Sequence, residues 1–488
     1  MGKKAVKILI PVLGFLFLTA YIRSATVDVV YTDYLRLINS YLPDAADFRP
    51  YLQADILTRT PFTFLMRLIN VRLFGYSTTF DMILGALGLT WAACELAAYM
   101  SFRRFRLWTM LAVLFAVFSL DKWELLTNGT GWIHFWAVAF FIRHYRLYDR
   151  IRSGERKMSD ELWICLLPVI TILLFAGQYC VIYVPAMLVV YIFDMVDECR
   201  CRSSRVPKLK APARKCGAAC KAEENAGVFA RDGEGIDRKS RRIVWLRRIL
   251  CLLIPFLLYV ISFLLSDKSA AGATDRGFFE VLCTQPTLFL SMIVKSFAAV
   301  IITGETVTGL GIPESVVLMS GVVVLAMYVH SIIENFHSGL YRKTALPLLL
   351  LISGLAAHAA TFVTRWRFLD DAYLMSSRYS LQYMLGAAGI LLTMTGVKNP
   401  VRKSVVIIAI LAGQLLTTGL EISKAPYRQA AFEQMRETAY QYQEKTDEEL
   451  QTALQYHHDG EIKNALKILE DNHWNIWRDG EIAERKEE

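Results

Sequence analysis

Residues 162–196 read LWICLLPVITILLFAGQYCVIYVPAMLVVYIFDMV and contain one charged residue, Asp194. An α-helix needs about 20 apolar residues to cross the hydrocarbon core of a lipid bilayer. This run is therefore long enough for a helical hairpin that crosses the bilayer twice. It indicates an integral membrane protein built from α-helices.

The rest of the sequence repeats this pattern at shorter length. The 488 residues are 54% hydrophobic and their mean hydropathy is +0.34, which excludes an ordinary soluble multidomain protein. With the 162–196 hairpin, the other apolar runs predict an all-α polytopic membrane protein with about eleven transmembrane helices. Those runs are 6–22, 82–100, 107–120, 131–142, 244–265, 314–333, 345–363, 383–396 and 404–420.

The orientation follows from the basic loops, because short cytoplasmic loops retain Lys and Arg during insertion. Lys3, Lys4 and Lys7 place the N-terminus inside. Keeping every basic loop inside requires residues 288–303, which include Lys295, to form a re-entrant or surface helix. The C-terminus then lies outside. The other basic segments are Arg103–Arg106, Arg143–Lys157, Arg200–Arg248, Arg342–Lys343 and Lys398–Lys403.

Two segments have alternative interpretations. Residues 1–24 have the charge pattern of a signal peptide, but the long apolar run and Arg23 favour a retained anchor. The loop 197–242 is basic and is expected near anionic headgroups, so the net charge of +9 needs no nucleic-acid partner. Reduced or lipidated thiols are favoured over a zinc site, because the loop cysteines depart from Cys-x-x-Cys spacing: Cys199, Cys201, Cys216 and Cys220.

The tail after a membrane domain of residues 1–420 is polar and has the pattern of short helices. Within residues 421–488, Thr446 and Glu449 form a predicted capping box. Apolar residues then recur at helical spacing, and the tail is expected to fold as a small extracytoplasmic helical cap. These apolar residues are Ile462, Ala465, Leu466 and Leu469.

The first outer loop, residues 25–80, is much longer than a simple turn. It is expected to hold two amphipathic helices, over 34–42 and from Pro61 to just before Gly75. Asp33 lies just beyond the first span, where an ionised carboxylate could accept a proton from a substrate hydroxyl, and Asp28 is the alternative. The other interpretation, that Asp33 only caps the following helix, stays open.

A short outer loop between the third and fourth predicted spans carries Glu124 and Asn128 among tryptophans. The tryptophans are consistent with interfacial anchors. This loop is the second place where polar side chains gather on the outer face.

Three arginines precede the tenth predicted span on the outer side, against the positive-inside bias: Arg365, Arg367 and Arg378. A guanidinium group matches phosphate oxygens with two parallel hydrogen bonds, so this segment is a candidate for recognition of a lipid phosphate or diphosphate. The alternative is that the arginines pair with Asp370, Asp371 or lipid headgroups.

The order of these features resembles the GT-C superfamily of integral membrane glycosyltransferases, in particular a bacterial branch associated with surface polysaccharides. In that branch an acidic residue follows the first helix, and an Asn-Glu-His-Arg-type motif precedes a loop helix ending in Phe-Gly. A Glu-Asn-type loop follows the third helix, and a Ser-Arg-Tyr motif opens a late one. The corresponding residues are Asp33, Asp55-Ile56-Leu57-Thr58-Arg59 with Leu73-Phe74-Gly75, Glu124 with Asn128, and Ser377-Arg378-Tyr379. The second motif keeps only its Arg.

The resemblance implies a GT-C-like fold in a bacterial cytoplasmic membrane and transfer of a sugar from a polyprenyl-phosphate-linked donor to a glycan, lipid or protein hydroxyl. Asp33 would be the base and Arg378 would bind the donor phosphate. Auxiliary substrate-binding residues would be Arg59, Glu124, Asn128, Arg365, Arg367 and Tyr379. Some GT-C enzymes use a divalent cation, and no outer His or acidic cluster in this sequence demands one.

Two other functional classes stay open. A transporter or flippase for lipid-linked sugars would concentrate charge inside the spans, where Glu95 is the clearest candidate. A non-catalytic scaffold of a polysaccharide assembly complex is the other alternative, because the motif around Arg59 departs from the family pattern.

Overall fold

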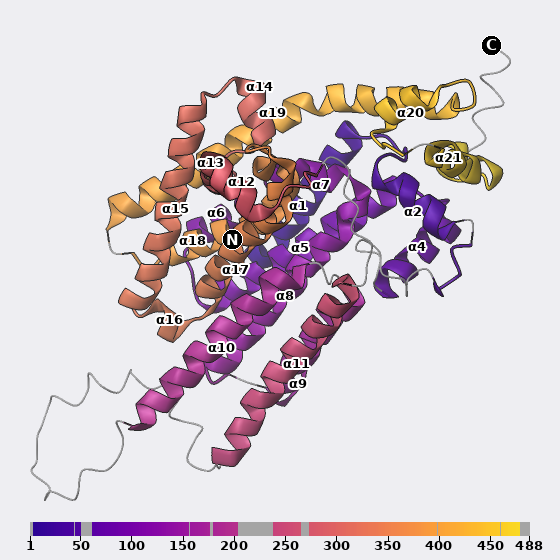
Figure 1. Cartoon of the computed structure of the whole chain (residues 1–488). Helices are drawn as coiled ribbons and strands as arrows, with labels where there is room; N and C mark the ends of the chain where they lie inside the picture. The colour runs from indigo at the N-terminus through magenta and orange to yellow at the C-terminus, as the bar shows by residue number, and fades with distance from the viewer. Residues whose placement is uncertain are drawn as a thin grey trace, which may run out of the picture.

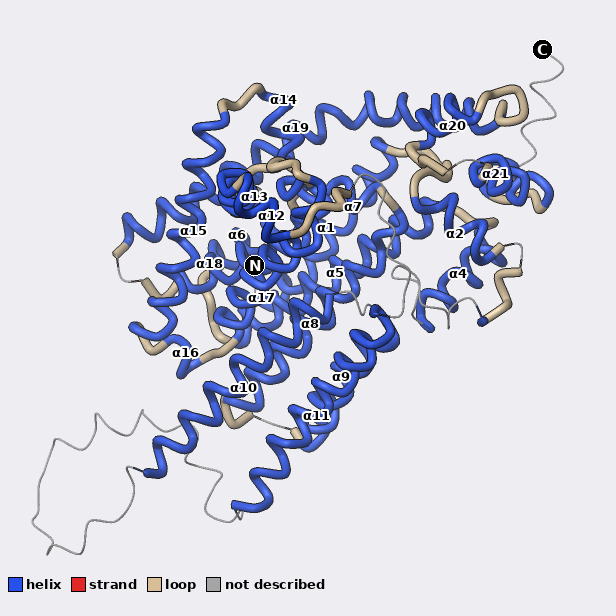
Figure 2. The backbone as a smooth tube through the Cα atoms, viewed as in Figure 1, coloured by secondary structure: helices blue, strands red, loops and turns tan. Residues whose placement is uncertain are grey.

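The computed structural model describes residues 3–42, 44–49, 61–155, 157–175, 179–203, 238–264, 273–397, 399–458 and 460–478. Every regular element in these ranges is a helix (Figure 2). Arg59, Cys216 and Cys220, and most of the 197–242 loop, lie outside them. The expected all-α fold class is confirmed for the described part of the chain.

Seven of the described helices are long and apolar enough to cross a membrane. Their outward faces are apolar: in the fourth of them, Ile254, Leu257, Leu258 and Ile261 are each more than half exposed. Such a surface is stable in lipid and costly in water. The chain is therefore a multi-pass membrane protein. The seven helices are α1 (Lys3–Ala25), α5 (Thr78–Phe102), α10 (Cys180–Ser203), α11 (Arg238–Leu264), α15 (Glu314–His337), α17 (Leu346–Arg365) and α19 (Pro400–Tyr440).

An eighth span is formed if α12 (Phe278–Thr284) and α13 (Pro286–Ala298) count as one broken crossing. The two helices meet at an angle of 99°, with Gln285 between them and Pro286 opening α13. A proline at the first helical position and a sharp break fit either a broken span or a re-entrant segment. The re-entrant or surface helix expected at 288–303 stays a prediction.

The count of about eleven spans is not confirmed. Four further predicted spans are helical but do not meet the length and hydropathy of a span, either because they are short or because they carry charge. At 1.5 Å per residue, the 12 residues of α6 extend about 18 Å, well short of the roughly 30 Å hydrocarbon core. These elements are α6 (Leu107–Phe118), α8 (Trp132–Arg152), α9 (Met158–Val169) with the π-helix η3 (Ile170–Phe175), and α18 (Ser380–Met394).

Close helix contacts hold the bundle together, with α5 packed along α8 and α17 along α18 (Figure 1). The crossing of α17 and α18 depends on two glycines. A Cβ built on Gly354 would lie 2.6 Å from the Cα of Gly386, and Tyr328 of α15 fills the remaining space. All residues of α18 from Ser380 to Met394 are buried, so this helix is surrounded by protein. Small residues at such crossings are typical of membrane helices.

A second hydrophobic core joins the long first loop, residues 25–80, to the C-terminal tail. The predicted helices of the loop are observed as α2 (Asp33–Tyr41) and α4 (Pro61–Phe74), and Gly75 follows α4 with a φ of 58°. The tail continues α19 into α20 (Asp447–Leu454), α21 (Glu461–Asp471) and the short η9 (Asn475–Trp477). Buried side chains from both regions form one cluster, including Tyr31, Leu35, Ile38, Phe432, Leu454, Leu466 and Trp477.

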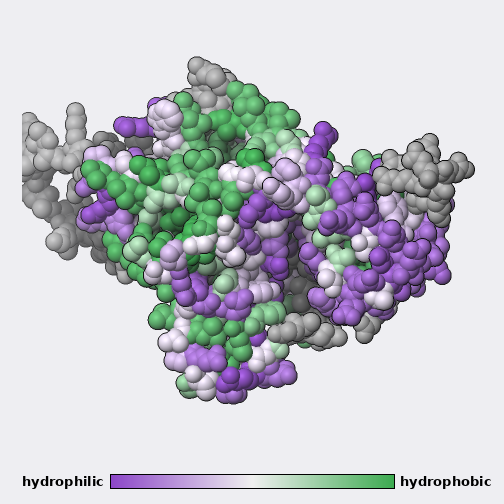
Figure 3. Space-filling view, turned by 90° about the horizontal axis from the view of Figure 1, so that it is seen from above, coloured by the Kyte–Doolittle hydropathy of each residue, from purple (hydrophilic) through white to green (hydrophobic). Residues whose placement is uncertain are grey.

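This loop–tail unit lies at one end of the bundle (Figure 1). Its surface is largely hydrophilic, whereas the bundle surface is largely hydrophobic (Figure 3). The capping box is confirmed, because the Thr446 amide donates to Glu449 at 2.8 Å and the Glu449 amide donates to the Thr446 hydroxyl at 3.3 Å. The buried apolar positions of the predicted C-terminal helix are also confirmed.

Candidate functional site

Glu124 and the Ser-Arg-Tyr turn are in direct contact. Glu124 lies in α7 (Trp123–Thr127), and the turn forms the 3₁₀ helix η8 (Ser377–Tyr379). Glu124 Oε1 is 2.5 Å from Arg378 Nη2, and Oε2 accepts hydrogen bonds from the hydroxyls of Ser376 at 3.0 Å and Ser377 at 3.3 Å. Two predicted site residues that are 254 positions apart in the sequence therefore form one ion pair.

A second carboxylate holds the same turn from another side. Glu305 belongs to α14 (Gly304–Leu310) and accepts hydrogen bonds from the Ser377 amide at 3.0 Å and the Ser377 hydroxyl at 3.2 Å. The sequence analysis missed Glu305, and its only local signal is an acidic residue next to an apolar segment. The two carboxylates together position the backbone and the guanidinium of the turn.

The long helix α19 supports the Glu124 loop through Arg428. The guanidinium carbon of Arg428 is 3.4 Å from the centre of the Trp123 ring. Arg428 also pairs with Glu421, whose side chain is fully buried, and donates to the Tyr21 hydroxyl at 2.6 Å. Glu421 and Arg428 are seven residues apart and therefore share one face of α19. They were also missed, because this part of the chain was assigned to a polar tail.

Asn128 connects the Glu124 loop to the residue before Asp33. Its side-chain amide donates to the Thr32 hydroxyl at 3.4 Å, and its carbonyl accepts from the Thr130 hydroxyl at 2.7 Å. Thr32 has a φ of 49° and a ψ of −130°, a strained conformation for a β-branched residue. The Thr32 amide donates to the Leu454 carbonyl at 2.9 Å, so the strained residue is held from two sides.

Tyr31 places the segment before Asp33 next to the Glu124–Arg378 ion pair. Its ring is buried, and its hydroxyl lies 3.5 Å from the Thr127 carbonyl. Burial raises the pKa of Tyr31, the negative charge of Glu124 raises it further, and Arg378 opposes them. The residues just before Asp33 therefore lie in the electrostatic field of the Glu124–Arg378 pair.

The two candidate bases have different surroundings. The Asp28 carboxylate accepts four hydrogen bonds, from the Ser77 hydroxyl at 2.5 Å, the Thr78 amide at 2.7 Å, the Thr78 hydroxyl at 2.8 Å and the Asn475 amide at 2.9 Å. This arrangement joins the start of α5 to η9 and favours a structural role for Asp28. Asp33 is half-buried at the start of α2, and no group in the described part of the chain donates a hydrogen bond to its carboxylate.

The two other predicted arginines of the described chain, Arg365 and Arg367, have different surroundings. Arg367 is 45% exposed and donates twice to the Thr274 carbonyl, at 3.1 and 2.9 Å, away from the Glu124 pair. The guanidinium carbon of Arg365 lies 5.9 Å from the centre of the Tyr379 ring. Arg365 Nε and the Tyr379 hydroxyl are both buried, and the two side chains are hydrogen-bond neighbours. Burial raises the pKa of Tyr379, while Arg365 and Arg378 both oppose that rise, so the tyrosine is in the field of both arginines.

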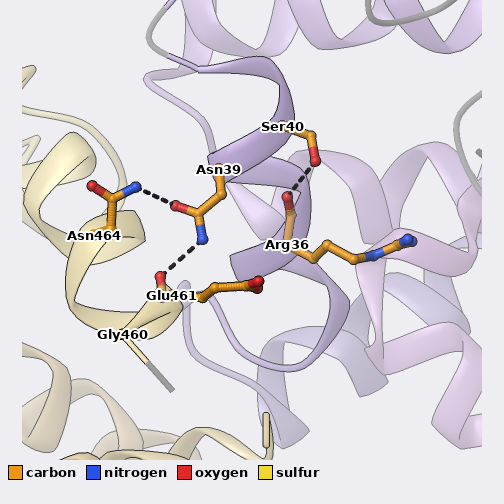
Figure 4. A pocket seen from close by; sticks show the side chains of 6 residues that line it. All are labelled: Arg36, Asn39, Ser40, Gly460, Glu461 and Asn464. Carbon is orange, nitrogen blue, oxygen red and sulfur yellow. Dashed lines mark hydrogen bonds between the residues drawn. The ribbon is translucent and has the colours of Figure 1, made fainter. Parts of the chain in front are cut away.

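A polar groove of about 340 Å³ runs between α2 and α21 (Figure 4). Asn39 bridges its walls by donating to the Glu461 carbonyl and accepting from Asn464, both at 2.8 Å. Arg36, one turn after Asp33, also lines the groove. Tyr456 lies between the groove and Asp33. Its hydroxyl donates a hydrogen bond to Glu461, and the charges of Arg36 and Asp33 both act on that hydroxyl.

The function of this region cannot be read from a metal site in the described residues or from a similar known protein. Across the described ranges there is no group of three or more His, Cys, Asp or Glu side chains that could hold a metal ion. No family model, curated protein or solved structure matches the chain, so a function is inferred from the geometry of the site.

Proposed function

We propose that the protein is a membrane glycosyltransferase that moves a sugar from a polyprenyl-phosphate-linked donor to a hydroxyl of a cell-envelope glycan, lipid or protein. The observation that carries the proposal is the convergence of three distant segments. Asp33 follows Thr32, which contacts Asn128, and Asn128 ends the short helix from which Glu124 holds Arg378. The Asp33 carboxylate, which accepts no hydrogen bond from the described residues, and the Arg378 guanidinium are thus connected through one loop.

Arg378 is the proposed ligand of the donor phosphate. Its side chain is 47% exposed, and the contact to Glu124 uses Nη2. A guanidinium group has five N–H donors, so the others can bind phosphate oxygens while Glu124 fixes the orientation of the side chain. Arg365 supports this role, because it places a second positive charge beside the Tyr379 ring of the same turn.

Asp33 is the proposed base. The acceptor hydroxyl transfers its proton to the Asp33 carboxylate while its oxygen forms a bond to the anomeric carbon of the sugar. The bond between that carbon and the phosphate oxygen breaks, and its electron pair stays on the phosphate. Arg378 stabilises this charge. The α2–α21 groove, lined by amide, hydroxyl and charged groups, supports binding of a hydroxyl-rich acceptor beside Asp33.

The proposal also includes a membrane arrangement. It needs the site, the first loop and the tail on the outer face of a bacterial cytoplasmic membrane, with the N-terminus inside and the C-terminus outside. The positive-inside pattern supports this arrangement, as does the position of α2, α4, α20 and α21 at one end of the bundle (Figure 1). A GT-C-like bundle of about eleven crossings and an extracytoplasmic cap belong to the same proposal.

The test uses the purified full chain in nanodiscs with polyprenyl-phosphate sugars and cell-envelope acceptors, and it measures released polyprenyl phosphate. We expect Asp33→Asn and Arg378→Gln each to reduce the rate by about 10²–10⁴-fold. Asp471→Asn and Arg436→Gln are matched controls: Asp471 is an exposed residue of α21, and Arg436 pairs with Glu433 on α19.

Two outcomes contradict the proposal. Normal transfer by Asp33→Asn excludes Asp33 as the base. If the wild type releases no polyprenyl phosphate but moves the intact lipid-linked sugar across vesicle membranes, the protein is a transporter.

A further inference from the structure

A cavity of about 210 Å³ lies between the start of α1 and the ends of α5 and α8. Its apolar wall includes Ala98 and Phe102 of α5, and its charged wall holds one acidic side chain, Asp149, and three basic ones: Lys7, Arg146 and Arg150. None of these residues belongs to the proposed transfer site. A cavity with one apolar wall and one mainly basic wall suits a ligand that has an apolar part and a negatively charged part.

The charges around this cavity do not cancel. Glu95 is shared by two arginines, with distances of 2.8 Å to Arg146 and 3.3 Å to Arg143. Lys7 has no ion-pair partner among the described residues. The lining side chains and the ion pairs connected to them comprise five basic and three acidic residues: Lys7, Arg103, Arg143, Arg146 and Arg150, and Glu95, Asp149 and Asp160.

The cavity lies at the level of a membrane interface. Phe102 at the end of α5 is 42% exposed, and Trp108 at the start of α6 is 80% exposed. Between them is the basic segment Arg103–Arg106. Exposed aromatic rings next to basic residues are typical of the headgroup region. After Lys7 in the sequence, the exposed face of α1 is apolar, with Ile8 69% and Leu13 53% exposed. The acyl chains of a lipid bound at the cavity can therefore continue along this helix.

We propose that this cavity binds the phosphate headgroup of an anionic phospholipid, on the face that the basic loops predict to be cytoplasmic. Lys7 and Arg146 contact the phosphate, and Phe102 and Ala98 contact the glycerol and the first acyl carbons. Basic pockets between membrane helices are the usual sites for such headgroups. The proposal is independent of the transfer reaction, because it concerns the opposite end of the bundle.

The test is native mass spectrometry of the delipidated full chain, titrated with phosphatidylglycerol, phosphatidylcholine or glycerol 3-phosphate. The wild type is expected to bind phosphatidylglycerol several-fold more tightly than the other two probes. Lys7→Gln should weaken phosphatidylglycerol binding about fivefold, which corresponds to the loss of one basic side chain near an anionic lipid. Arg106→Gln removes an equal charge from the same face outside the cavity and is the matched control.

Ala98→Leu provides a test that does not depend on charge. It fills the apolar wall and should also weaken phosphatidylglycerol binding, with no change in phosphatidylcholine binding. Equal phosphatidylglycerol binding by Lys7→Gln and Arg106→Gln would overturn the proposal. Equal binding of the two lipids by the wild type, or binding of glycerol 3-phosphate as tight as that of phosphatidylglycerol, would also overturn it.

Discussion

Replacing Asp28 and Asp33 by Asn tests whether the two candidate bases have different roles. The exchange is the same at both positions and removes one negative charge without changing the size of the side chain. At Asp28, three of the four hydrogen bonds fall on Oδ1, which Asn retains. Ser77 then faces an NH₂ group in place of Oδ2. The bond with Ser77 then forms in the reverse direction, with the Asn NH₂ group donating to the Ser77 hydroxyl, and all four bonds become neutral.

The expected loss of stability in Asp28→Asn follows from the hydrogen bonds that the Asp28 carboxylate accepts. A hydrogen bond to a charged group contributes about 1 kcal/mol more than a neutral one, so Asp28→Asn should lose about 2–4 kcal/mol of local stability. That loss corresponds to an increase of about thirty- to several hundred-fold in local opening, since 1.4 kcal/mol is a factor of ten. Asp33→Asn breaks no hydrogen bond within the described ranges and should leave stability unchanged while transfer is lost.

Hydrogen–deuterium exchange of the amides of Thr78 and Asn475 measures this opening directly. Both belong to the junction that Asp28 forms, since the Thr78 amide donates to Asp28 and the Asn475 amide donates to the Gly75 carbonyl at 2.6 Å. Unchanged exchange in Asp28→Asn would refute a structural role for Asp28. Faster exchange of the same two amides in Asp33→Asn would show that Asp33 also stabilises this junction.

Three further predictions concern stability. Burial raises the pKa of Tyr76 to about 12, from 10.0 in the unfolded chain. The contribution of the neutral Tyr76 side chain to the free energy of unfolding is therefore complete below pH 10 and is lost as the pH rises from 10 to 12. Tyr76→Phe should remove this pH dependence, which flattens that part of an alkaline unfolding profile. Gly386→Ala should destabilise the bundle by a few kcal/mol, because its Cβ would overlap the Tyr328 hydroxyl, whereas Gly419→Ala meets nothing within 4 Å and should be neutral in thermal unfolding. Arg428→Gln should cost about 3–5 kcal/mol in thermal unfolding, because it leaves a buried Glu421 without its closest cation; a midpoint equal to that of Arg436→Gln would contradict this.

Hydropathy predicted where most helices lie but not which of them cross the bilayer. Apolar runs at α1, α5, α10, α11, α15, α17 and α19 are long helices in the structure. The runs at α6 and α18 are equally apolar in sequence, yet α18 is enclosed by protein along its whole length. A helix buried in protein and a helix facing lipid both require apolar side chains, so composition does not distinguish them.

The sequence predicted that Asp33 and Arg378 belong to one site, but not the contacts that connect them. Asp33 stood out by its position just beyond the first span, Arg378 by its position against the positive-inside bias, and Glu124 and Asn128 by the resemblance to the GT-C pattern. Glu305 did not stand out, because its role depends on a contact with a backbone amide 72 residues away. Asp28 and Asp33 have similar sequence surroundings, and their different hydrogen-bond partners come from α5 and η9.

The sequence by itself determined an all-helical membrane protein with a polar first loop and a polar tail, because backbone hydrogen bonding in lipid permits few structures and hydropathy follows from composition. It also determined the capping box at Thr446, which needs only residues three apart. Only the tertiary structure decided that the first loop and the tail share a core, and that Glu124 holds Arg378. Those contacts join residues hundreds of positions apart, and their energy depends on distance and burial that no local pattern contains.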